Sequence, residues 1–254
     1  MNFVPPPQVP PLRESRVHAS LRLHEEEPDE ADINILADLS AEDYSQILTA
    51  AQPRRYAIGD SVFQQGEEHE GIFILTAGEI RSYYIGPSGR EITLAYWAPG
   101  NFVGGPELFG RGRHMWSGQA TKPTEVLQIR GPALRTLMLA IPRLAVAMVE
   151  ALAHKGKCYS ALLQMLGTRS AAERLAQLLL LLGTLDGQRT ERGLRIKRSL
   201  TQEDLAKMVG STRQWVTSSL DRLRTEGLIE GASHHITILD EARLRLFAGH
   251  PAEA

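Results

Sequence analysis

The sequence contains a single cysteine, Cys158, among its 254 residues. One thiol excludes a disulfide framework within the chain, and it excludes an iron–sulfur cluster or a zinc site held by four thiolates. Such sparing use of cysteine is typical of a reducing compartment. We therefore expect a cytoplasmic protein without structural disulfides.

Long apolar runs and an excess of one charge are also missing. No uninterrupted apolar run reaches about 18 residues, so the sequence predicts no membrane span. The first residues, MNFVPPPQVPPLRES, lack the apolar core of a signal peptide. The net charge is −2. Residues 1–33 hold seven acidic and three basic residues, so the remaining chain is only mildly basic, and groups that bind a polyanion must be placed locally.

The pattern along the chain predicts an α+β organisation. Proline and acidic residues dominate 1–33, which buries too little apolar surface to fold and is expected to be a tail. Residues 34–51 predict a short helix with Ser40 as its N-cap. Short β-branched and aromatic runs, broken by glycines up to about residue 130, predict an antiparallel sandwich or barrel. We divide the rest into a β-rich domain (34–141), a long helix with a hinge (142–168) and a C-terminal domain (169–254).

The helix after Pro142 carries a heptad pattern with one polar interruption. This pattern is typical of a core-facing helix or of a dimer seam, and we assign it to a dimer interface. The predicted interface residues are Met148, Leu152, Lys155, Tyr159, Leu162 and Leu166. The Lys155 ammonium either snorkels outward to water or meets an anionic ligand, because a buried ammonium needs a partner.

The stretch LAKMVGSTRQWVTSSLDRLRTEGLI (205–229) predicts two short helices joined near Gly210. Thr201 with Asp204, and Ser211 with Gln214, have the spacing of capping boxes and predict helix starts near 202 and 212. A helical repeat puts three apolar residues of the second helix on one side, and these are Val216, Leu220 and Leu223.

The opposite side of this second helix carries Arg213, Gln214, Thr217, Ser218 and Asp221. Such groups suit base edges, since arginine pairs with guanine O6 and N7 and glutamine pairs with adenine N6 and N7. The first turn of the second helix enters the major groove in a helix-turn-helix. We predict contacts with double-stranded DNA from Thr201, Ser211, Thr212, Arg213, Gln214, Thr217 and Ser218.

The stretch GLIEGASHHITIL (227–239) predicts a two-stranded ribbon, the wing of a winged helix. His234 and His235 lie at its tip and are either simply exposed or close to DNA phosphates. The upstream basic stretch RGLRIKR (192–198) is likewise either a solvated strand or a phosphate-binding one.

Four motifs together resemble the family of the cyclic-AMP receptor protein and the fumarate–nitrate reduction regulator over residues 35–245. They are GDSVFQQGE (59–67), GIFILTAGEIR (71–81), GNFVGGPELF (100–109) and LTQEDLAKMVGSTRQWVTSSLDRLRTEGLI (200–229). The resemblance implies a β-roll that binds a small-molecule effector, a homodimer, and a winged helix-turn-helix that reads a near-palindromic DNA site. It also implies RNA polymerase as a partner.

The chain departs from the family pattern where cyclic AMP would bind. That pattern offers Gly-Glu for the ribose and Arg-Ser for the phosphate, whereas the matching places here hold Gly104–Gly105 and His114–Met115. Because charge-assisted bonds to a buried phosphate are lost, we expect an effector other than cyclic AMP. The resemblance assigns effector contacts to Gly104, Gly105, Glu107, His114, Met115, Tyr159 and Ser160.

Three alternatives remain open for this region. Arg111 and Arg113 would supply a shifted phosphate clamp. His114 and Met115 would serve as axial ligands of a haem. Side chains such as Trp116 or Tyr159 would fill the pocket, so that no effector is needed.

The second helix departs from the family pattern too. Both well-known branches of the family carry glutamate at the place of Gln214 and arginine at the place of Ser218, so we predict a different DNA half-site. Arg213 matches the arginine of the cyclic-AMP branch.

Other classes of function find less support in the sequence. No triad order, metal-ligand spacing or phosphate-binding loop indicates catalysis, so we do not expect an enzyme. A β-roll sensor whose helix-turn-helix docks a protein instead of DNA is the alternative from another class.

Overall fold

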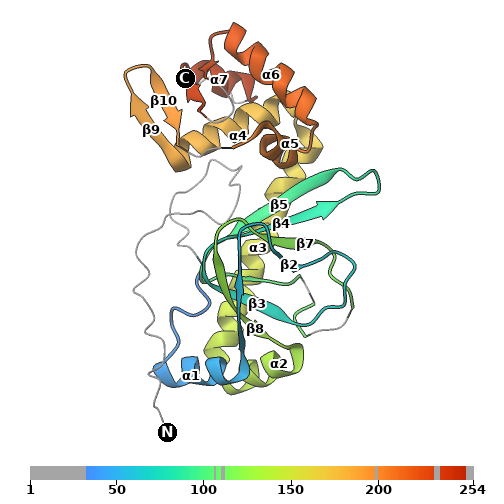
Figure 1. The fold of residues 1–254 in the computed structure, drawn as a ribbon. Helices are drawn as coiled ribbons and strands as arrows, with labels where there is room; N and C mark the ends of the chain where they lie inside the picture. The colour runs from blue at the N-terminus through green and yellow to red at the C-terminus, as the bar shows by residue number, and fades with distance from the viewer. Residues whose placement is uncertain (1–32, 106, 110–111, 198–199, 232–234, 250–254) are drawn as a thin grey trace.

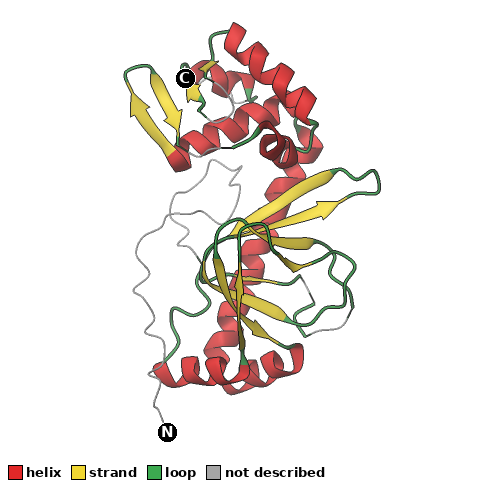
Figure 2. Cartoon of the chain, viewed as in Figure 1, coloured by secondary structure: helices red, strands yellow, loops and turns green. Residues whose placement is uncertain are grey.

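The computed structural model describes residues 33–105, 107–109, 112–197, 200–231 and 235–249. A β-rich half and a mainly helical half are joined by one long helix, α3 (Figure 1). Figure 2 shows that most strands belong to the first half, while the second half has a small sheet among its helices. Almost all of the predicted tail lies outside the described residues.

The first helix, α1 (Ala41–Ala50), begins where the sequence predicts an N-cap. The Ser40 hydroxyl accepts a hydrogen bond from the Asp43 N–H, and the Asp43 carboxylate accepts one from the Ser40 N–H. This capping box satisfies two amide groups at the helix start. The helix is shorter than predicted, because residues 35–38 form a turn that buries Ile35.

Two four-stranded antiparallel sheets form the β-roll, in the orders β1-β8-β3-β6 and β2-β7-β4-β5. Their strands are β1 (Gln52–Tyr56), β2 (Ser61–Phe63), β3 (Ile72–Ala77), β4 (Ile80–Ile85), β5 (Glu91–Trp97), β6 (Phe102–Val103), β7 (Ser117–Ala120) and β8 (Thr124–Ile129). Inward-facing side chains of both sheets, including Phe63, Leu75 and Trp97, share one core. The predicted hairpin turn at 86–90 joins β4 to β5, and the Gly86 N–H donates to the Arg90 carbonyl.

Two consecutive helices follow the β-roll: α2 (Gly131–Ala140) and α3 (Pro142–Thr168). Pro142 stands in the first turn of α3, where a missing N–H removes no helical hydrogen bond. The helix α2 was not predicted from the sequence. Among the described residues, no single helix is long and apolar enough to cross a membrane. The pair α2–α3 meets that test only when taken together, with a bend of 118° between them.

The side of α3 that was predicted to be the dimer seam faces the chain's own β-roll. Met148, Lys155 and Leu162 are buried there, and Tyr159 and Leu166 pack against buried clusters of the same chain. These five side chains therefore pack within one chain, whereas Leu152, the sixth predicted residue, is 36% exposed. The dimer interface itself stays a prediction.

A different row of α3 faces outward, displaced by one residue from the predicted one. Its members are exposed and recur at spacings of three and four: Val146, Val149, Ala153, Gly156, Ser160, Leu163 and Gly167. One residue turns the helix by about 100°, so the heptad spacing alone does not decide which side meets the β-roll. The inward side of α3 carries larger side chains, among them Met148, Lys155 and Tyr159, which pack against the β-roll.

The C-terminal half packs its helices on one face of a small sheet with the order β11-β12-β10-β9. Its elements are α4 (Ala171–Asp186), β9 (Gly187–Thr190), β10 (Gly193–Ile196), α5 (Gln202–Val209), α6 (Arg213–Thr225), β11 (Ile229–Glu230), β12 (Thr237–Ile238) and α7 (Glu241–Phe247). Ser170 caps α4 as predicted. The helix runs past its predicted end at Gly183, because the missing side chain there makes room for Leu194 and Ile238.

The two halves meet where the β4–β5 hairpin touches α5. Glu91 of β5 pairs with Arg81 of β4 and also with Lys207 of α5, whose Nζ lies 3.2 Å from the carboxylate. Tyr96 packs against the core of the C-terminal half, and Leu94 packs on the buried end of α3. The first helix of the helix-turn-helix is thus held against the β-roll by both charge and apolar contact.

Replacing Gly71 with alanine is expected to lower the free energy of unfolding by about 3 kcal/mol. Gly71 has φ +125°, and a Cβ there would lie 2.1 Å from the Ile129 carbonyl oxygen of the neighbouring strand. Gly59→Ala is the matched control, since Gly59 also has positive φ but has nothing within 4 Å, and it should cost only about 1 kcal/mol. Urea unfolding followed by tryptophan fluorescence measures both variants, and equal losses would contradict the steric argument.

Candidate functional site

The helix-turn-helix is built by local signals at each helix end. The Thr201 hydroxyl and the Asp204 carboxylate form the predicted capping box at the start of α5. Gly210 ends α5 in the left-handed conformation, with φ 62° and ψ 46°. At the start of α6 the cap is Thr212, which accepts from the Trp215 N–H. The prediction that Ser211 caps α6 is therefore corrected by one residue.

The two sides of α6 differ as the sequence predicts. Val216, Leu220 and Leu223 are buried in the core of the C-terminal half. Arg213 and Gln214, by contrast, are exposed in the first turn of α6. The Arg213 guanidinium forms no ion pair with any residue of the described ranges, so its donors remain available to an external acceptor.

Two further polar residues of α6 already have partners. The Thr217 hydroxyl donates to the Gln202 side chain of α5 at 2.6 Å, which ties the two helices together. Asp221 pairs with Arg224 within α6. Ser218 is exposed, and its hydroxyl donates to the Gln214 carbonyl at 3.2 Å. The exposed polar surface of α6 thus centres on Arg213, Gln214 and Ser218.

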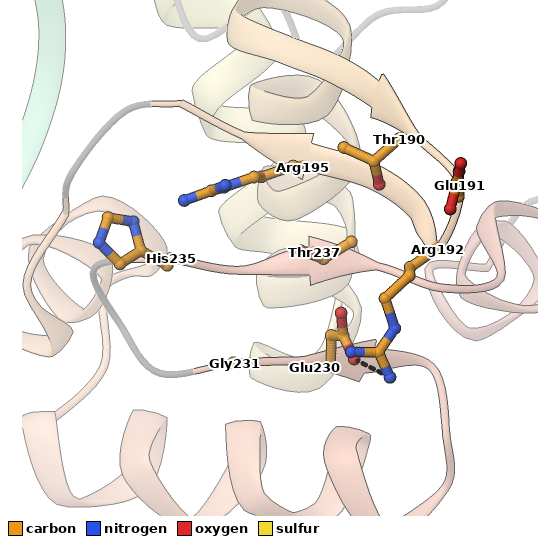
Figure 3. A pocket seen from close by; sticks show the side chains of 8 residues that line it. All are labelled: Thr190, Glu191, Arg192, Arg195, Glu230, Gly231, His235 and Thr237. Atoms are coloured by element: carbon orange, nitrogen blue, oxygen red, sulfur yellow. Dashed lines mark ion pairs between the residues drawn. The ribbon is translucent and has the colours of Figure 1, made fainter.

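The wing forms as predicted, with Ile229 opposite Ile238 and Glu230 opposite Thr237. Beside it, the outer side of the sheet has a hollow of about 720 Å³ (Figure 3). The residues that line it are Thr190, Glu191, Arg192, Arg195, Glu230, Gly231, His235 and Thr237. Of the two predicted wing histidines, His234 lies outside the described residues.

Charges in this hollow are divided between its two ends. At one end Arg192 pairs with Glu230 at 3.0 Å, so its charge is largely neutralised. At the other end the Arg195 and His235 side chains lie together (Figure 3). Arg195 is exposed, and no described residue forms an ion pair with it. This end of the hollow, where β10 runs beside the wing, therefore offers a free cation that suits a phosphate.

In the β-roll, part of the predicted effector set meets a second histidine that sequence reasoning missed. The buried His114 ring stacks on Phe63, with centroids 4.5 Å apart, and lies 4.5 Å from the ring of His69. Burial lowers the pKa of both histidines, and for His114 the neighbouring His69 lowers it further. Gly105 borders the His69 ring. His69 stands in a run of acids, EEHE (67–70), which gives no sign of burial.

The other predicted effector residues do not all converge on this place. Glu107 and Met115 are exposed. Tyr159 contacts Trp97 and Trp116 edge-on, at centroid distances of 6.4 and 5.7 Å. Ser160 belongs to the outward-facing row of α3. Gly104 is buried, and a Cβ there would lie 2.7 Å from the Gly71 carbonyl oxygen, so its place reflects close backbone packing.

The residues do not fit a haem held by His114 and Met115. The His114 ring is buried between two other rings, while Met115 is 59% exposed. One iron cannot take both as axial ligands in this arrangement. Within the described residues, no group of three or more histidine, cysteine, aspartate or glutamate side chains could hold a metal ion.

Lys155 is the least expected residue of this region. Its Nζ lies 3.1 Å from the centroid of the Trp97 ring and 4.8 Å from that of Phe102. Only 8% of Lys155 is exposed, so the prediction that its charge snorkels outward is wrong. The heptad position of Lys155 could have indicated burial, but nothing local in the sequence indicated the aromatic partners.

A β-roll joined through one long helix to a winged helix-turn-helix defines a class of DNA-binding regulators. The family model of the cyclic nucleotide-binding domain matches residues 53–140, and that of the Crp-like helix-turn-helix domain matches residues 173–247. The chain belongs to the cyclic-AMP receptor protein/fumarate–nitrate reduction regulator family of transcriptional regulators. Regulators of this family bind DNA through the helix-turn-helix and act as dimers.

Curated relatives agree with this assignment. The chain is 26% identical over 193 residues to the CRP-like cAMP-activated global transcriptional regulator of Mycobacterium tuberculosis, covering 76% of this chain and 86% of the relative. It is 26% identical over 196 residues to the fumarate and nitrate reduction regulatory protein of Vibrio cholerae, covering 77% and 78%.

Solved structures show the same fold. A CRP-family transcriptional regulator of Thermus thermophilus is 29% identical with a TM-score of 0.61, covering 79% of this chain and 99% of that one. The c-di-GMP responsive global regulator of Xanthomonas campestris is 20% identical with a TM-score of 0.71, covering 79% of this chain and 100% of that one. At this identity the similarity extends to the fold only.

Replacing Arg195 with alanine is expected to weaken binding to any duplex and to reduce the slope of log affinity against log salt by about one. The reason is that Arg195 is an exposed cation on β10, the strand beside the wing, without an ion pair among the described residues. Arg192→Ala is the control, because Arg192 is already paired with Glu230 and should change the slope less. Fluorescence anisotropy over a salt series measures both slopes, and equal changes would show that the pair at Glu230 does not matter.

Proposed function

We propose that the protein is a homodimeric regulator that reads a near-palindromic DNA site and responds to a small molecule other than cyclic AMP. The observation that carries the proposal is the free polar face at the start of α6, opposite a buried apolar face. In this proposal residues 34–141 sense the effector, 142–168 join two copies, and 169–254 bind DNA. RNA polymerase is the expected partner on the promoter.

Each DNA contact is assigned by what its side chain can do. Arg213 reads guanine through two parallel hydrogen bonds, and Gln214 reads adenine. Ser218 stands one turn further along α6 and contacts a neighbouring base edge. Thr201, Ser211 and Thr212 lie at helix starts, where amide N–H groups and hydroxyls bind phosphates. Thr217 acts through its bond to Gln202, which holds α6 against α5.

The dimer interface is assigned to the outward-facing row of α3. This row is exposed in the single chain, and Val149 and Leu163 leave 63% and 72% of their surface in contact with water. A Cβ added at Gly156 or Gly167 would meet nothing within 4 Å, so two helices can approach closely along this row. A symmetric pair of α3 helices would bury these apolar residues.

An effector other than cyclic AMP is proposed because the expected phosphate clamp is absent. At its place His114 is buried, and burial lowers its pKa, which favours the neutral ring. Of the two residues of the alternative clamp, Arg111 lies outside the described residues, and Arg113 is exposed and donates to the Gly66 carbonyl at 2.6 Å. Neither His114 nor Arg113 offers a buried cation to a cyclic phosphate.

Arg213→Ala is expected to weaken binding to a selected duplex by about 1–3 kcal/mol and to relax discrimination at one base pair. The duplex is selected from a random library by the wild-type protein and tested by anisotropy against a scrambled duplex. Arg222→Ala is the control on the same helix, because Arg222 pairs with Glu226 at 2.7 Å.

Equal loss on the selected and scrambled duplexes would contradict base reading by Arg213. If the wild type selects no duplex and its binding does not weaken with salt, the helix-turn-helix docks a protein and the proposed function fails.

Leu163→Glu is expected to dissociate the dimer, because the two-fold axis would bring two buried carboxylates together. The dissociation constant should rise at least about a hundredfold, or about 2.7 kcal/mol. Leu139→Glu is the control, since Leu139 is 78% exposed on α2, outside the row. Sedimentation velocity over a concentration series measures both variants, and a Leu163→Glu dimer of unchanged strength would place the interface elsewhere.

A further inference from the structure

The strongest unexplained feature of the chain is the buried amine of Lys155, on the β-roll side of α3. No carboxylate of a described residue pairs with it. Its neighbours are aromatic: Trp97 of β5 and Phe102 of β6 lie under its Nζ. Among the described residues, the titratable group that acts on its charge is Cys158 on the same helix, and Tyr159 lies one turn further along α3.

The free energy that is lost by burying an ammonium without a partner exceeds the free energy that contacts with two aromatic rings provide. Burial lowers the pKa of Lys155 well below its ordinary value, and the Cys158 thiol opposes this only in part. A methionine would fill the same space without this cost. A lysine at a place where it lowers stability, facing the sensor domain, indicates a role in recognition.

The surroundings of Lys155 define the shape and charge of a ligand. Trp97 is held in place because its indole N–H donates to the Ser82 hydroxyl at 3.0 Å. Tyr159 and Trp116, both only partly buried, lie edge-on to each other at 5.7 Å and cover the outer side of this aromatic cluster. Flat apolar walls suit an aromatic ring. One lysine is a point charge that suits a carboxylate, whereas a phosphate is better held by the fork of arginine.

We propose that Lys155, with Trp97, Trp116 and Tyr159, is the recognition site for a small aromatic monocarboxylate. The ligand's ring takes the place of the contact between Tyr159 and Trp116. The Lys155 amine is protonated, moves away from the Trp97 ring and pairs with the ligand's carboxylate. This inference gives the effector of the proposed regulator a chemical class, and it rests on that proposed function.

Binding is coupled to a proton with a definite sign. The carboxylate stabilises the charged form, so the pKa of Lys155 is higher in the complex than in the free protein. Affinity is greatest below the free pKa and falls about tenfold for each pH unit above it, until the pKa of the complex is reached. In that window each bound carboxylate brings one proton into the protein.

The experiment is isothermal titration calorimetry of the full-length protein with benzoate and with phenylacetate, and with benzyl alcohol as the uncharged probe. Two buffers of different ionisation enthalpy are used at each of several pH values. We expect at least one carboxylate to bind, benzyl alcohol to bind at least about tenfold more weakly, and the observed enthalpy to depend on the buffer. Trp97 fluorescence should change on binding, because the amine leaves its ring.

Two substitutions test the role of Lys155 itself. Lys155→Met should lower affinity for the carboxylate at least about tenfold and abolish the buffer dependence, with an unchanged or higher unfolding temperature. Lys155→Arg keeps a permanent charge, so it should retain binding without proton uptake. Lys157→Met is the control, because Lys157 is an exposed lysine on the same helix and should leave affinity unchanged.

Two results would overturn the inference. One is that neither carboxylate binds at millimolar concentration, which supports a pocket filled by Tyr159 and Trp116. The other is that Lys155→Met binds the carboxylate as tightly as the wild type does. Neither result affects the selection of DNA by Arg213, so this inference can fail while the proposed regulator stands. A protein that selects no duplex would contradict the proposed regulator, whatever the calorimetric result.

Discussion

The junction between the β-roll and the helix-turn-helix centres on one carboxylate, that of Glu91, together with the apolar contacts of Tyr96 and Leu94. This carboxylate holds Arg81 on its own sheet and Lys207 on α5, so it belongs to both halves of the chain at once. The α5 helix is tied to α6 by a shared core and by the bond from Thr217 to Gln202. A shift of the β4–β5 hairpin would therefore move α5 and α6 as one body. Because Glu91 is only partly buried, solvent and salt weaken this link.

The long helix α3 connects the same hairpin to the proposed dimer partner by presenting two different sides. Its inner side carries large groups, among them Met148, Lys155 and Tyr159, which fill the space beneath the β-roll. Its outer side carries Gly156, Ser160 and Gly167 between exposed apolar residues such as Val149 and Leu163. Since both sides belong to one helix, a rearrangement around Lys155 on the inside would shift residues on the outside. In the proposed regulator, sensing and dimer geometry would then be coupled without a separate relay element.

Local signals in the sequence predicted much of the fold and the division of α6 into a buried apolar side and an exposed polar side. The caps at Ser40, Ser170 and Thr201 lie where predicted, because a hydroxyl and an acid three residues apart satisfy amides locally. The buried side of α6 also follows from spacing alone. The side of α3 that packs on the β-roll could not be predicted, since two neighbouring rows both have heptad spacing and only the β-roll decides between them. The aromatic surroundings of Lys155 come from strands more than fifty residues away, and no local pattern records such contacts.

Gly156 has a consequence for which operators a dimer of this chain could accept. It lies in the middle of the open row of α3, next to Lys155, and the space beside it is open. A glycine at that position lets two rods cross with their backbones nearly touching, whereas any bulkier residue would act as a wedge between them. Widening the rods there would spread the two reading helices further apart at the far end. The distance between the centres of the two half-sites would then depend on the volume of the side chain at position 156, although this position contacts no nucleotide.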